Sequence, residues 1–378
     1  MVALAFVLAS LAAQESPGPR QGAVRVAAVS PAARFVDPRL EAREEILAAV
    51  DRNLAALESL VDRAAAEGAA AVALPEDTPG LGRWEDARPE RLPEILPEAV
   101  RRMLERLGRA AARHRLYLVC CSDTFEEGAV SNTAFLLGRD GREIGRYRKV
   151  NLPLQEQDKR RGTEFPVFPT PDLGAVGMLI CYDMVFPEAP RCLALAGADI
   201  IFHPTLGGAA IGDADISRAA FRTRAVENFV YLVVAHRGGG SLVISPQGRI
   251  LAEAPGPDTL AVADIDPFGG REGGDAFNRQ RDMRARLFRE RSPQAFGILT
   301  DPDPPVLAKA PLPVPVERVI RIARAAHATG DERYRRAAEL QREGKREEAI
   351  RAFEALREEF PGTWIERAAR DRLKELRP

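Results

Sequence analysis

Apolar runs alternate with amphipathic segments along most of the chain from residue 24 onward. Residues 24–29 form a β-like run, and residues 39–67 form a long charged segment whose apolar side chains recur at helical spacing. A buried strand beginning at residues 71–74 and a helix at residues 90–114 repeat this order. Further strands are predicted at residues 116–121, 132–137, 143–147, 175–180, 199–203, 230–235, 241–245, 250–253 and 260–265, and further helices at 187–195 and 213–228.

Two pairs of these strands carry hairpin signals. Asp140 and Gly141 separate two apolar runs, and an Asp-Gly pair in that position favours a tight antiparallel turn. A second turn at residues 246–248 separates the strands on either side of it. Mixed strands and helices with several hairpins predict a layered α/β architecture rather than an all-parallel sheet.

The C-terminal part of the chain has a different pattern. Residues 301–315 are Pro-rich and lack periodicity, which is typical of a linker. Residues 316–378 are helix-forming and heavily charged, and a last helix at 364–376 would cap them. Small, large and terminating residues fall where a tetratricopeptide repeat places them, at Ala337, Leu340, Ala349, Phe353, Leu356 and Pro361. One such unit would serve packing or partner binding; a featureless helical tail is the alternative.

The first residues have the character of an export signal. Residues 3–13 are apolar, too few to span a bilayer as a helix, and small residues follow them. We therefore expect residues 1–21 to be a signal peptide and leader, and the protein to be exported to the periplasm or secreted. Because no Lys or Arg precedes the apolar run, an uncleaved anchor or a misassigned start remains open. No other stretch is apolar enough to cross a membrane stably.

Composition narrows the class of partner. The chain has 378 residues, enough for one large domain, predicted at 22–300, plus an appendage. A formal net charge of -1 gives no overall basic field, so nucleic acid is not expected as a partner. The four cysteines are too few for a disulfide scaffold, and the adjacent Cys120 and Cys121 are interpreted as buried small hydrophobic residues.

Three side chains that could take part in a reaction each follow an apolar strand: Glu76, Lys149 and Cys181. In open α/β sheets, functional sites gather at strand ends. A cysteine there is a candidate nucleophile if a cation or helix start lowers its pKa or a base lies beside it. A partly buried glutamate with a raised pKa would exchange its proton with the thiol and a leaving amine. A lysine ammonium would stabilise an oxyanion. Taken singly, a cysteine at a strand end is more often structural, and a glutamate or lysine there is more often an ordinary solvated or helix-capping charge.

The order and local context of the three residues are more specific. Leu-Pro-Glu ending at Glu76, Tyr-Arg-Lys-x-x-Leu-Pro around Lys149 and Ile-Cys-Tyr-Asp around Cys181 resemble the nitrilase, or carbon–nitrogen hydrolase, superfamily. The resemblance runs from about residue 24 to residue 299. Further matching segments are Asn132-Thr-Ala, Phe186-Pro-Glu188, Ala196-Gly-Ala-Asp199, Arg224-Ala-Val-Glu-Asn228, Ser241 with the following turn, and the segment that starts at Arg291.

The resemblance implies a fold and an assembly. The family has a four-layer αββα sandwich, which here would carry a small all-helical C-terminal appendage. It dimerises through its sheets in an αββα–αββα arrangement, so a homodimer through the hydrolase domain is expected. The C-terminal helices are a possible site for a protein partner.

The resemblance also implies roles for individual residues. Glu76 would be the general base and acid, Lys149 the oxyanion stabiliser, and Cys181 the nucleophile that forms a thioester. The backbone N–H of Tyr182 would complete the oxyanion hole. Many members have a second glutamate that positions substrate; Glu156, seven residues after Lys149, fits best, and Glu164 is the other choice.

Departures from the family pattern leave the substrate open. The segment after Glu156 reads Lys159-Arg-Arg-Gly162 where Thr-Pro-Gly is usual, and Ser30 stands where Gln is frequent. Asp183 after the cysteine favours amidases and carbamoylases over true nitrilases. The expected activity is therefore hydrolysis of a small amide or N-carbamoyl compound at a non-peptide C–N bond, without a metal or organic cofactor.

Other classes of function fit the sequence less well. The four histidines are scattered, so a metal hydrolase is not favoured, and His203 is interpreted as pocket lining or a structural residue. No G-x-S-x-G elbow points to a serine hydrolase. A non-catalytic scaffold that retains the fold, and an acyltransferase that passes the thioester to an amine, remain alternatives.

Overall fold

The computed structural model describes residues 22–206, 214–269 and 282–377, and within them the chain forms two six-stranded sheets. The predicted leader, residues 1–21, lies outside the described residues. Among the residues that are described, no helix has the length and apolar character needed to cross a membrane.

The first sheet has the strand order β12-β1-β2-β3-β4-β5. Its parallel centre is formed by β1, β2 and β3, and antiparallel pairs flank this centre on both sides. The bounds are β1 (Val24–Ser30), β2 (Ala71–Ala73), β3 (Tyr117–Glu126), β4 (Ala129–Leu137), β5 (Glu143–Arg148) and β12 (Thr259–Ile265). Asp140 and Gly141 lie in the turn between β4 and β5, as the hairpin signal predicts.

The second sheet has the order β11-β10-β9-β8-β7-β6 and repeats this design. Its parallel centre is β7, β8 and β9, with antiparallel neighbours at each edge. The bounds are β6 (Val167–Thr170), β7 (Gly174–Met178), β8 (Ile200–Thr205), β9 (Tyr231–His236), β10 (Leu242–Ile244) and β11 (Ile250–Glu253). The carboxyl ends of the two parallel centres therefore carry the residues that follow β2, β7 and β8.

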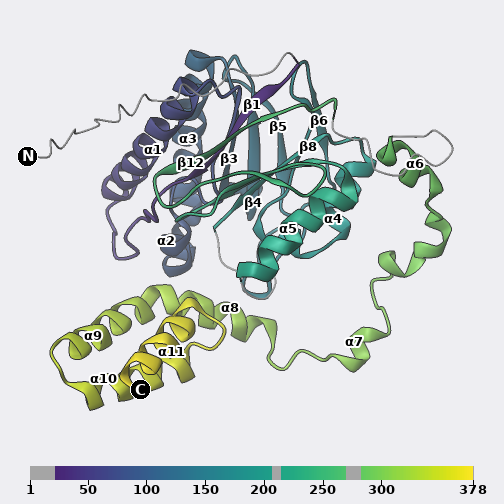
Figure 1. The fold of residues 1–378 in the computed structure, drawn as a ribbon. Coiled ribbons are helices and arrows are strands. Elements are labelled where there is room, and N and C mark those ends of the chain that lie inside the picture. Colours follow the sequence, from purple (N-terminus) through teal and green to yellow (C-terminus); the bar gives the residue numbers. More distant parts are fainter. Residues whose placement is uncertain (1–21, 207–213, 270–281, 378) are drawn as a thin grey trace, which may run out of the picture.

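Helices cover the outer faces of both sheets (Figure 1). The first sheet is covered by α1 (Arg43–Ala66) and α3 (Leu92–His114), and the second by α4 (Glu188–Leu195) and α5 (Ala214–Asn228). One apolar core fills the space between the sheets, and another lies between the first sheet and its helices. The result is the αββα sandwich of the nitrilase type, as the sequence predicts.

Some elements differ from the sequence prediction. β3 and β4 are 10 and 9 residues long, because their pairing continues through polar residues such as Asp123 and Asn132, where the apolar pattern stops. The edge strand β6 contains Pro169 and a partly exposed face, so it lacks the apolar alternation that identifies a strand. The short helix α2 (Gly82–Ala87) was not predicted either.

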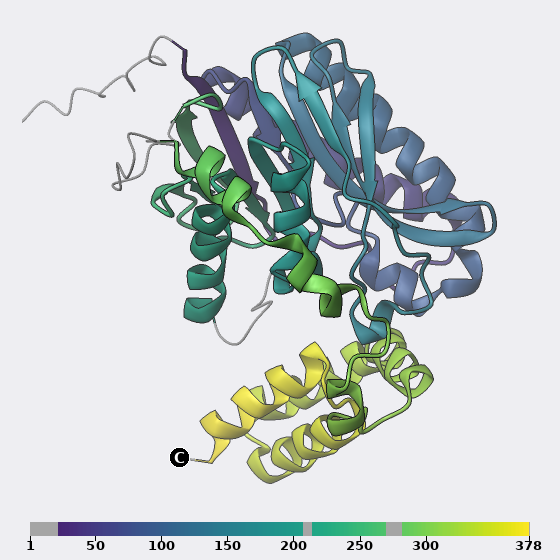
Figure 2. The ribbon, with the colours of Figure 1, turned by 90° about the vertical axis from the view of Figure 1, so that its right-hand side faces the viewer.

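A helical segment follows the sandwich (Figure 2). After α6 (Met283–Glu290) and the short α7 (Val306–Lys309), which lies within the predicted linker, come α8 (Val316–Ala325), α9 (Asp331–Arg342), α10 (Arg346–Glu359) and α11 (Trp364–Leu376). Residues including Ala337, Phe353 and Leu373 form a separate apolar core between these helices. The predicted helices are confirmed, and their assignment as a tetratricopeptide-like unit stays a prediction, as do the domain boundaries.

Candidate active site

Glu76 lies just past β2, almost completely buried at 2% exposed. Its Oε1 accepts hydrogen bonds from Asn132 Nδ2 at 2.8 Å and from Lys149 Nζ at 3.2 Å. Its Oε2 accepts the backbone N–H of Leu206 at 3.1 Å. The carboxylate is therefore held by donors from both sheets, in one orientation.

Lys149 follows β5 and is buried between two carboxylates. Its Nζ lies 3.2 Å from Glu76 Oε1 and 3.0 Å from Glu156 Oε2. Burial alone would lower the pKa of Lys149, but the charges of Glu156 and Glu76 outweigh burial and raise that pKa well above its ordinary value. The side chain is thus a fixed ammonium.

Cys181 begins a 3₁₀ turn, η3 (Cys181–Val185), three residues after β7 ends. Its φ of 43° lies in the left-handed region, which a non-glycine residue adopts at an energetic cost. The turn is a sharp one that presents the thiol at the end of the strand, close enough to Glu76 and Lys149 for their charges to act on it. Glu76, Lys149 and Cys181, far apart in the sequence, therefore meet.

The charges at this site differ from those expected from sequence. Burial raises the pKa of the Cys181 thiol to about 12, and the negative charge of Glu76 adds to this. Burial would also raise the pKa of Glu76, but the charge and hydrogen bond of Lys149 and the hydrogen bond of Asn132 bring it below its usual value of 4.5. The glutamate pKa is therefore lowered rather than raised, and of the two routes to an activated thiol the structure offers the adjacent base, Glu76. The resting pair is a neutral thiol beside an ionised base.

Asp183, two residues after the cysteine, ties the Cys181 turn to the segment that follows Lys149. Its Oδ2 accepts from Tyr147 Oη at 2.7 Å and from the Ile180 N–H at 3.0 Å. Its Oδ1 accepts from Asn151 N–H at 2.8 Å and Nδ2 at 3.0 Å. This buried carboxylate fixes the thiol and the ammonium relative to each other.

Of the remaining predicted residues, Glu156 contacts the site and Tyr182 follows the nucleophile directly. Glu156 contacts Lys149, whereas Glu164 is exposed, so the contact favours Glu156 as the second glutamate. Tyr182 lies in η3, and its ring packs edge-on against Phe186 at 5.5 Å. The oxyanion role of its backbone N–H stays a prediction.

His203 is completely buried on β8. Its Nδ1 lies 3.1 Å from the Leu179 carbonyl oxygen, and its ring packs on Phe221 with a centroid separation of 5.6 Å. Burial lowers the pKa of His203 to about 4, so the imidazole is neutral at physiological pH. These contacts give His203 a structural environment beneath the Cys181 turn.

Several supporting residues were not singled out from sequence. Asn132 and Leu206 hold Glu76, and Thr205 lies close to the Cys181 thiol, whose pKa it lowers. Arg237 donates from Nη2 to the backbone carbonyl oxygens of Glu76 and Asp77. Asn132 belongs to a recognised motif, but its role follows from the β3–β4 pairing, which sequence does not give. Leu206 acts through its backbone and leaves no side-chain signal.

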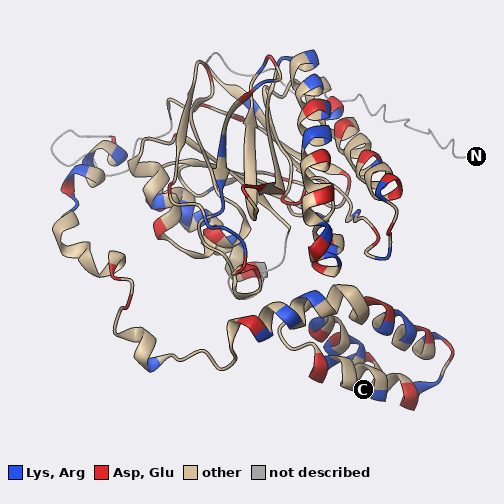
Figure 3. Cartoon of the chain, turned by 180° about the vertical axis from the view of Figure 1, so that it is seen from behind, with Lys and Arg blue, Asp and Glu red and all other residues tan. Residues whose placement is uncertain are grey.

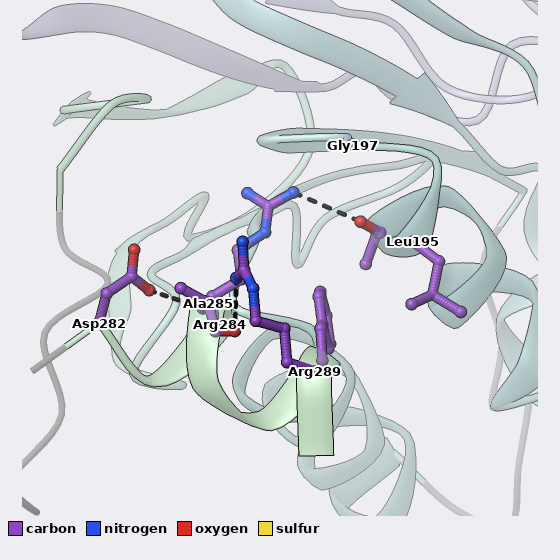
Figure 4. Close-up of a pocket in the computed structure, with 8 residues that line it drawn as sticks. Leu195, Gly197, Asp282, Arg284, Ala285 and Arg289 are labelled. Carbon is purple, nitrogen blue, oxygen red and sulfur yellow. Dashed lines mark hydrogen bonds between the residues drawn. The ribbon is translucent and has the colours of Figure 1, made fainter. Parts of the chain in front are cut away.

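A separate hollow lies where α6 meets α4 (Figure 4). Arg284 is a lining residue, and its guanidinium is engaged with Asp199 Oδ1 at 2.9 Å and with the Ala198 carbonyl oxygen at 2.8 Å. Its lining does not include Glu76, Lys149 or Cys181. Its polar groups thus join α6 to the sandwich rather than serving the chemistry.

Comparison with known proteins identifies relatives of this site. The family described as carbon-nitrogen hydrolase matches residues 32–271. A deaminated glutathione amidase of Synechocystis is 32% identical over 240 residues, 57% of this chain and 86% of the relative. An N-carbamoylputrescine amidase of Arabidopsis thaliana is 28% identical, over 67% of this chain and 92% of the relative. A solved structure of an amidase from Nesterenkonia sp. AN1 is 25% identical in sequence and aligns with a TM-score of 0.57. The alignment covers 73% of this chain and 99% of the amidase. That structure has the acetamide moiety of fluoroacetamide bound covalently at the active-site cysteine.

Proposed function

Since the chain belongs to the carbon–nitrogen hydrolase family, we propose that it hydrolyses a non-peptide C–N bond of a small amide or N-carbamoyl compound through a thioester at Cys181. The observation that carries this assignment is the meeting of a thiol, an ammonium and a carboxylate at one site, where Lys149 and Glu76 are buried and Cys181 is half-buried. Each group has the protonation state that its role requires.

The first half of the reaction forms the thioester. Glu76, ionised at rest, takes the proton of the neutral Cys181 thiol while sulfur attacks the substrate carbonyl carbon. The oxygen becomes negative, and the Lys149 ammonium with the Tyr182 backbone N–H stabilises it. The C–N bond then breaks as Glu76 returns the proton to nitrogen, and ammonia or an amine leaves.

The second half consumes one water molecule. Glu76 takes a proton from water as the oxygen attacks the thioester carbon. The C–S bond then breaks to release the acid, and Glu76 gives the proton to sulfur, which restores the thiol and the carboxylate. The net reaction converts an amide and water into a carboxylic acid and an amine. Glu156, on the other side of Lys149, would position the substrate and keep the ammonium in place.

The names of the relatives indicate which substrates to test first. They include amidases named for deaminated glutathione and N-carbamoylputrescine, and an amidase that carries an acetamide moiety on its cysteine. A panel of short aliphatic amides, ω-amides of dicarboxylic acids and N-carbamoyl amines therefore covers the class. Ammonia release measured across the panel would identify the preferred group.

Replacement of the nucleophile tests the mechanism directly. We expect Cys181→Ala to abolish turnover of the best substrate, because no thioester can form, while Cys192→Ser, which changes an exposed cysteine, retains it. Mass spectrometry of the wild-type protein during turnover should detect the acyl group on Cys181. Turnover by Cys181→Ala at the wild-type rate would exclude the mechanism. Formation of hydroxamate with added hydroxylamine would indicate that amines also resolve the thioester, as in an acyltransferase.

A further inference from the structure

The C-terminal segment, defined as residues 316–377 with helices α8–α11, packs against the two elements that adjoin the site glutamates. α8 lies on η2 (Leu154–Glu156), the short 3₁₀ turn that ends with Glu156. η6 (Ala326–Gly330), a one-turn π-helix, lies on α2, which begins six residues after Glu76. Figures 1 and 2 place the segment at this end of the sandwich.

The first contact reaches the loop that carries Glu156. Arg324 of α8 forms an ion pair with Asp158, two residues after Glu156. On its inner side the same loop is anchored by Lys159 Nζ on Asp123 Oδ2 at 2.5 Å and by the Arg160 N–H on the Val130 carbonyl at 2.7 Å. α8 thus supplies the outer anchor of a loop whose inner face contacts Lys149.

The second contact reaches the backbone of Glu76 through stacked side chains. The guanidinium carbon of Arg83 lies 5.5 Å from the ring centroid of Trp364 and 4.4 Å from that of Phe35. Arg237 lies on the same Phe35 ring at 5.2 Å and donates to the carbonyl oxygen of Glu76 at 3.3 Å. Cation–π stacking of this kind holds guanidinium groups in defined positions.

A further polar contact joins the segment to the same face. His327 Nδ1 lies 2.7 Å from Asp86 Oδ2 of α2, and its ring stacks on Trp364 at 6.4 Å. Charged residues of both signs are distributed along the helices of the segment (Figure 3). The segment is therefore joined to the sandwich by specific polar and aromatic contacts and not only by the chain that connects them.

We propose that the C-terminal segment is a positioning element of the active site, with Arg324 and Arg83 as the positioning residues. Arg324 holds the Glu156 loop, and Arg83 holds the Phe35–Arg237 stack that ends on Glu76. The segment thus fixes both carboxylates that flank the Lys149 ammonium. This inference rests on the proposed function, because it gives Glu76, Lys149 and Glu156 their roles.

Position matters at this site because the ammonium acts at short range. Lys149 is held between Glu76 and Glu156 at 3.2 Å and 3.0 Å, so displacement of either carboxylate moves the charge that faces the oxyanion. A misplacement of about 1 Å can cost on the order of a hundredfold in rate. An outer contact that restrains the loop therefore affects kcat although it touches no substrate.

Charge reversal in the full-length protein tests the first contact. We expect Arg324→Asp and Asp158→Arg each to lower kcat by about tenfold with a smaller change in KM, because a repulsive pair releases the loop. The double variant Arg324→Asp/Asp158→Arg restores the pair and should recover kcat to within about twofold of wild type. Arg333→Asp is the matched control, because Arg333 pairs with Glu359 inside the segment, and it should leave kcat unchanged.

A double-mutant cycle separates positioning from general destabilisation. In a Glu156→Gln background the Arg324→Asp change should lose most of its effect, because the two act through the same contact. Arg83→Ala acts through Glu76 and should keep its effect in that background. The assignment of Arg324 would be overturned if Arg324→Asp lowered kcat by the same factor in the Glu156→Gln background as in the wild type. A double charge reversal that recovered no kcat would also overturn it.

A measurement without substrate distinguishes this inference from the proposed function. The amide protons of Arg160 and Gly162 form the hydrogen bonds that hold the loop to the sandwich. Because loss of the outer contact frees the loop, these protons should exchange faster in Arg324→Asp than in Arg333→Asp. If the wild type turned over no compound of the panel, the proposed function would fail, and this exchange would still report on the contact. Equal exchange in the two variants would show that α8 does not restrain the loop and would sink the inference.

Discussion

The negative charge of Glu76 is one cause of the unreactive resting state of Cys181. Burial is the largest cause of the raised thiol pKa, and the Glu76 charge comes next, whereas Lys149 acts in the opposite direction. Removing the carboxylate charge leaves the ammonium in place. A variant without that charge should therefore contain a more acidic thiol that nevertheless lacks its base.

We expect Glu76→Gln to abolish amide turnover and at the same time to increase alkylation of Cys181 by iodoacetamide near neutral pH. The pKa of the thiol is about 12 in the wild type and falls in the variant, so the alkylation rate begins to rise at a lower pH. Peptide mass mapping separates Cys181 from the exposed Cys192. Glu156→Gln is the matched control and should shift the profile less, since its charge is a smaller cause. An unchanged or higher midpoint in Glu76→Gln would contradict this account.

The role of Asp183 follows from the groups that donate hydrogen bonds to it. Its two oxygens accept four hydrogen bonds, from Tyr147, Ile180 and Asn151. In Asp183→Asn an NH₂ group would face donors, and each buried donor left unpaired costs about 1–3 kcal/mol. We expect lower thermal stability and a large fall in kcat, measured by calorimetry and ammonia release.

The matched control for that substitution lies at another tyrosine–aspartate pair. Tyr117 donates to the half-exposed Asp172 at 3.0 Å, in contact with Arg139 rather than with the cysteine turn. Asp172→Asn should leave kcat nearly unchanged and cost little stability, because water can replace the lost partner. Equal losses of kcat in the two variants would mean that Asp183 does not position Cys181.

The identities of the three reacting residues were predictable from sequence, but their charge states were not. Glu76, Lys149 and Cys181 each stand in a recognisable motif at the end of an apolar strand. Their pKa values depend on burial and on partners such as Asn132 that come from distant parts of the chain. No local pattern states how near Lys149 approaches Glu76, 73 residues away.

At the scale of elements, one close approach between a helix and a hairpin positions β5. A Cβ added at Gly108 of α3 would lie 2.6 Å from the carbonyl oxygen of Gly141, in the turn between β4 and β5. This backbone atom cannot move away as a flexible side chain would. Gly108 therefore lets α3 lie directly on the hairpin whose second strand leads to Lys149.

We expect Gly108→Ala to destabilise the protein by about 1–3 kcal/mol, because overpacking forces the helix and the hairpin apart. Urea unfolding followed by circular dichroism would measure it. Gly297→Ala is the control, since a Cβ there meets nothing within 4 Å, and it should lie close to wild type. A stability of Gly108→Ala equal to that of the control would show that α3 and the hairpin can separate without cost.

Most elements of the sandwich were predictable, and the exceptions have a common cause. Apolar alternation identifies buried strands such as β1 and β9, and the structure has them within one or two residues of the predicted bounds. The edge strand β6 and the short helix α2 lack a full apolar face, because each packs on only part of its surface. Their sequences therefore carry too little periodicity to be recognised.

At the scale of the whole molecule, the layer order decides which surface a homodimer would use. The layer order αββα–αββα that the family resemblance implies has two helical layers at the junction, so the two copies would meet through helices and not directly through their sheets as expected from sequence. Among the described residues, the exposed large apolar side chains include Leu195 of α4 and Ile216 and Val226 of α5, and none lies on α1 or α3. The α4–α5 layer is therefore the favoured interface.

Light scattering after size exclusion tests the assembly. We expect a mass twice the 41.3 kDa of the chain for the wild type. Val226→Asp should shift the mass toward that of the monomer, because a twofold interface meets the new charge twice, once from each copy. Leu312→Asp, at an apolar side chain 58% exposed outside the sandwich, is the control and should keep the wild-type mass. A monomeric wild type, or a dimer that tolerates Val226→Asp, would mean that these apolar side chains serve another contact.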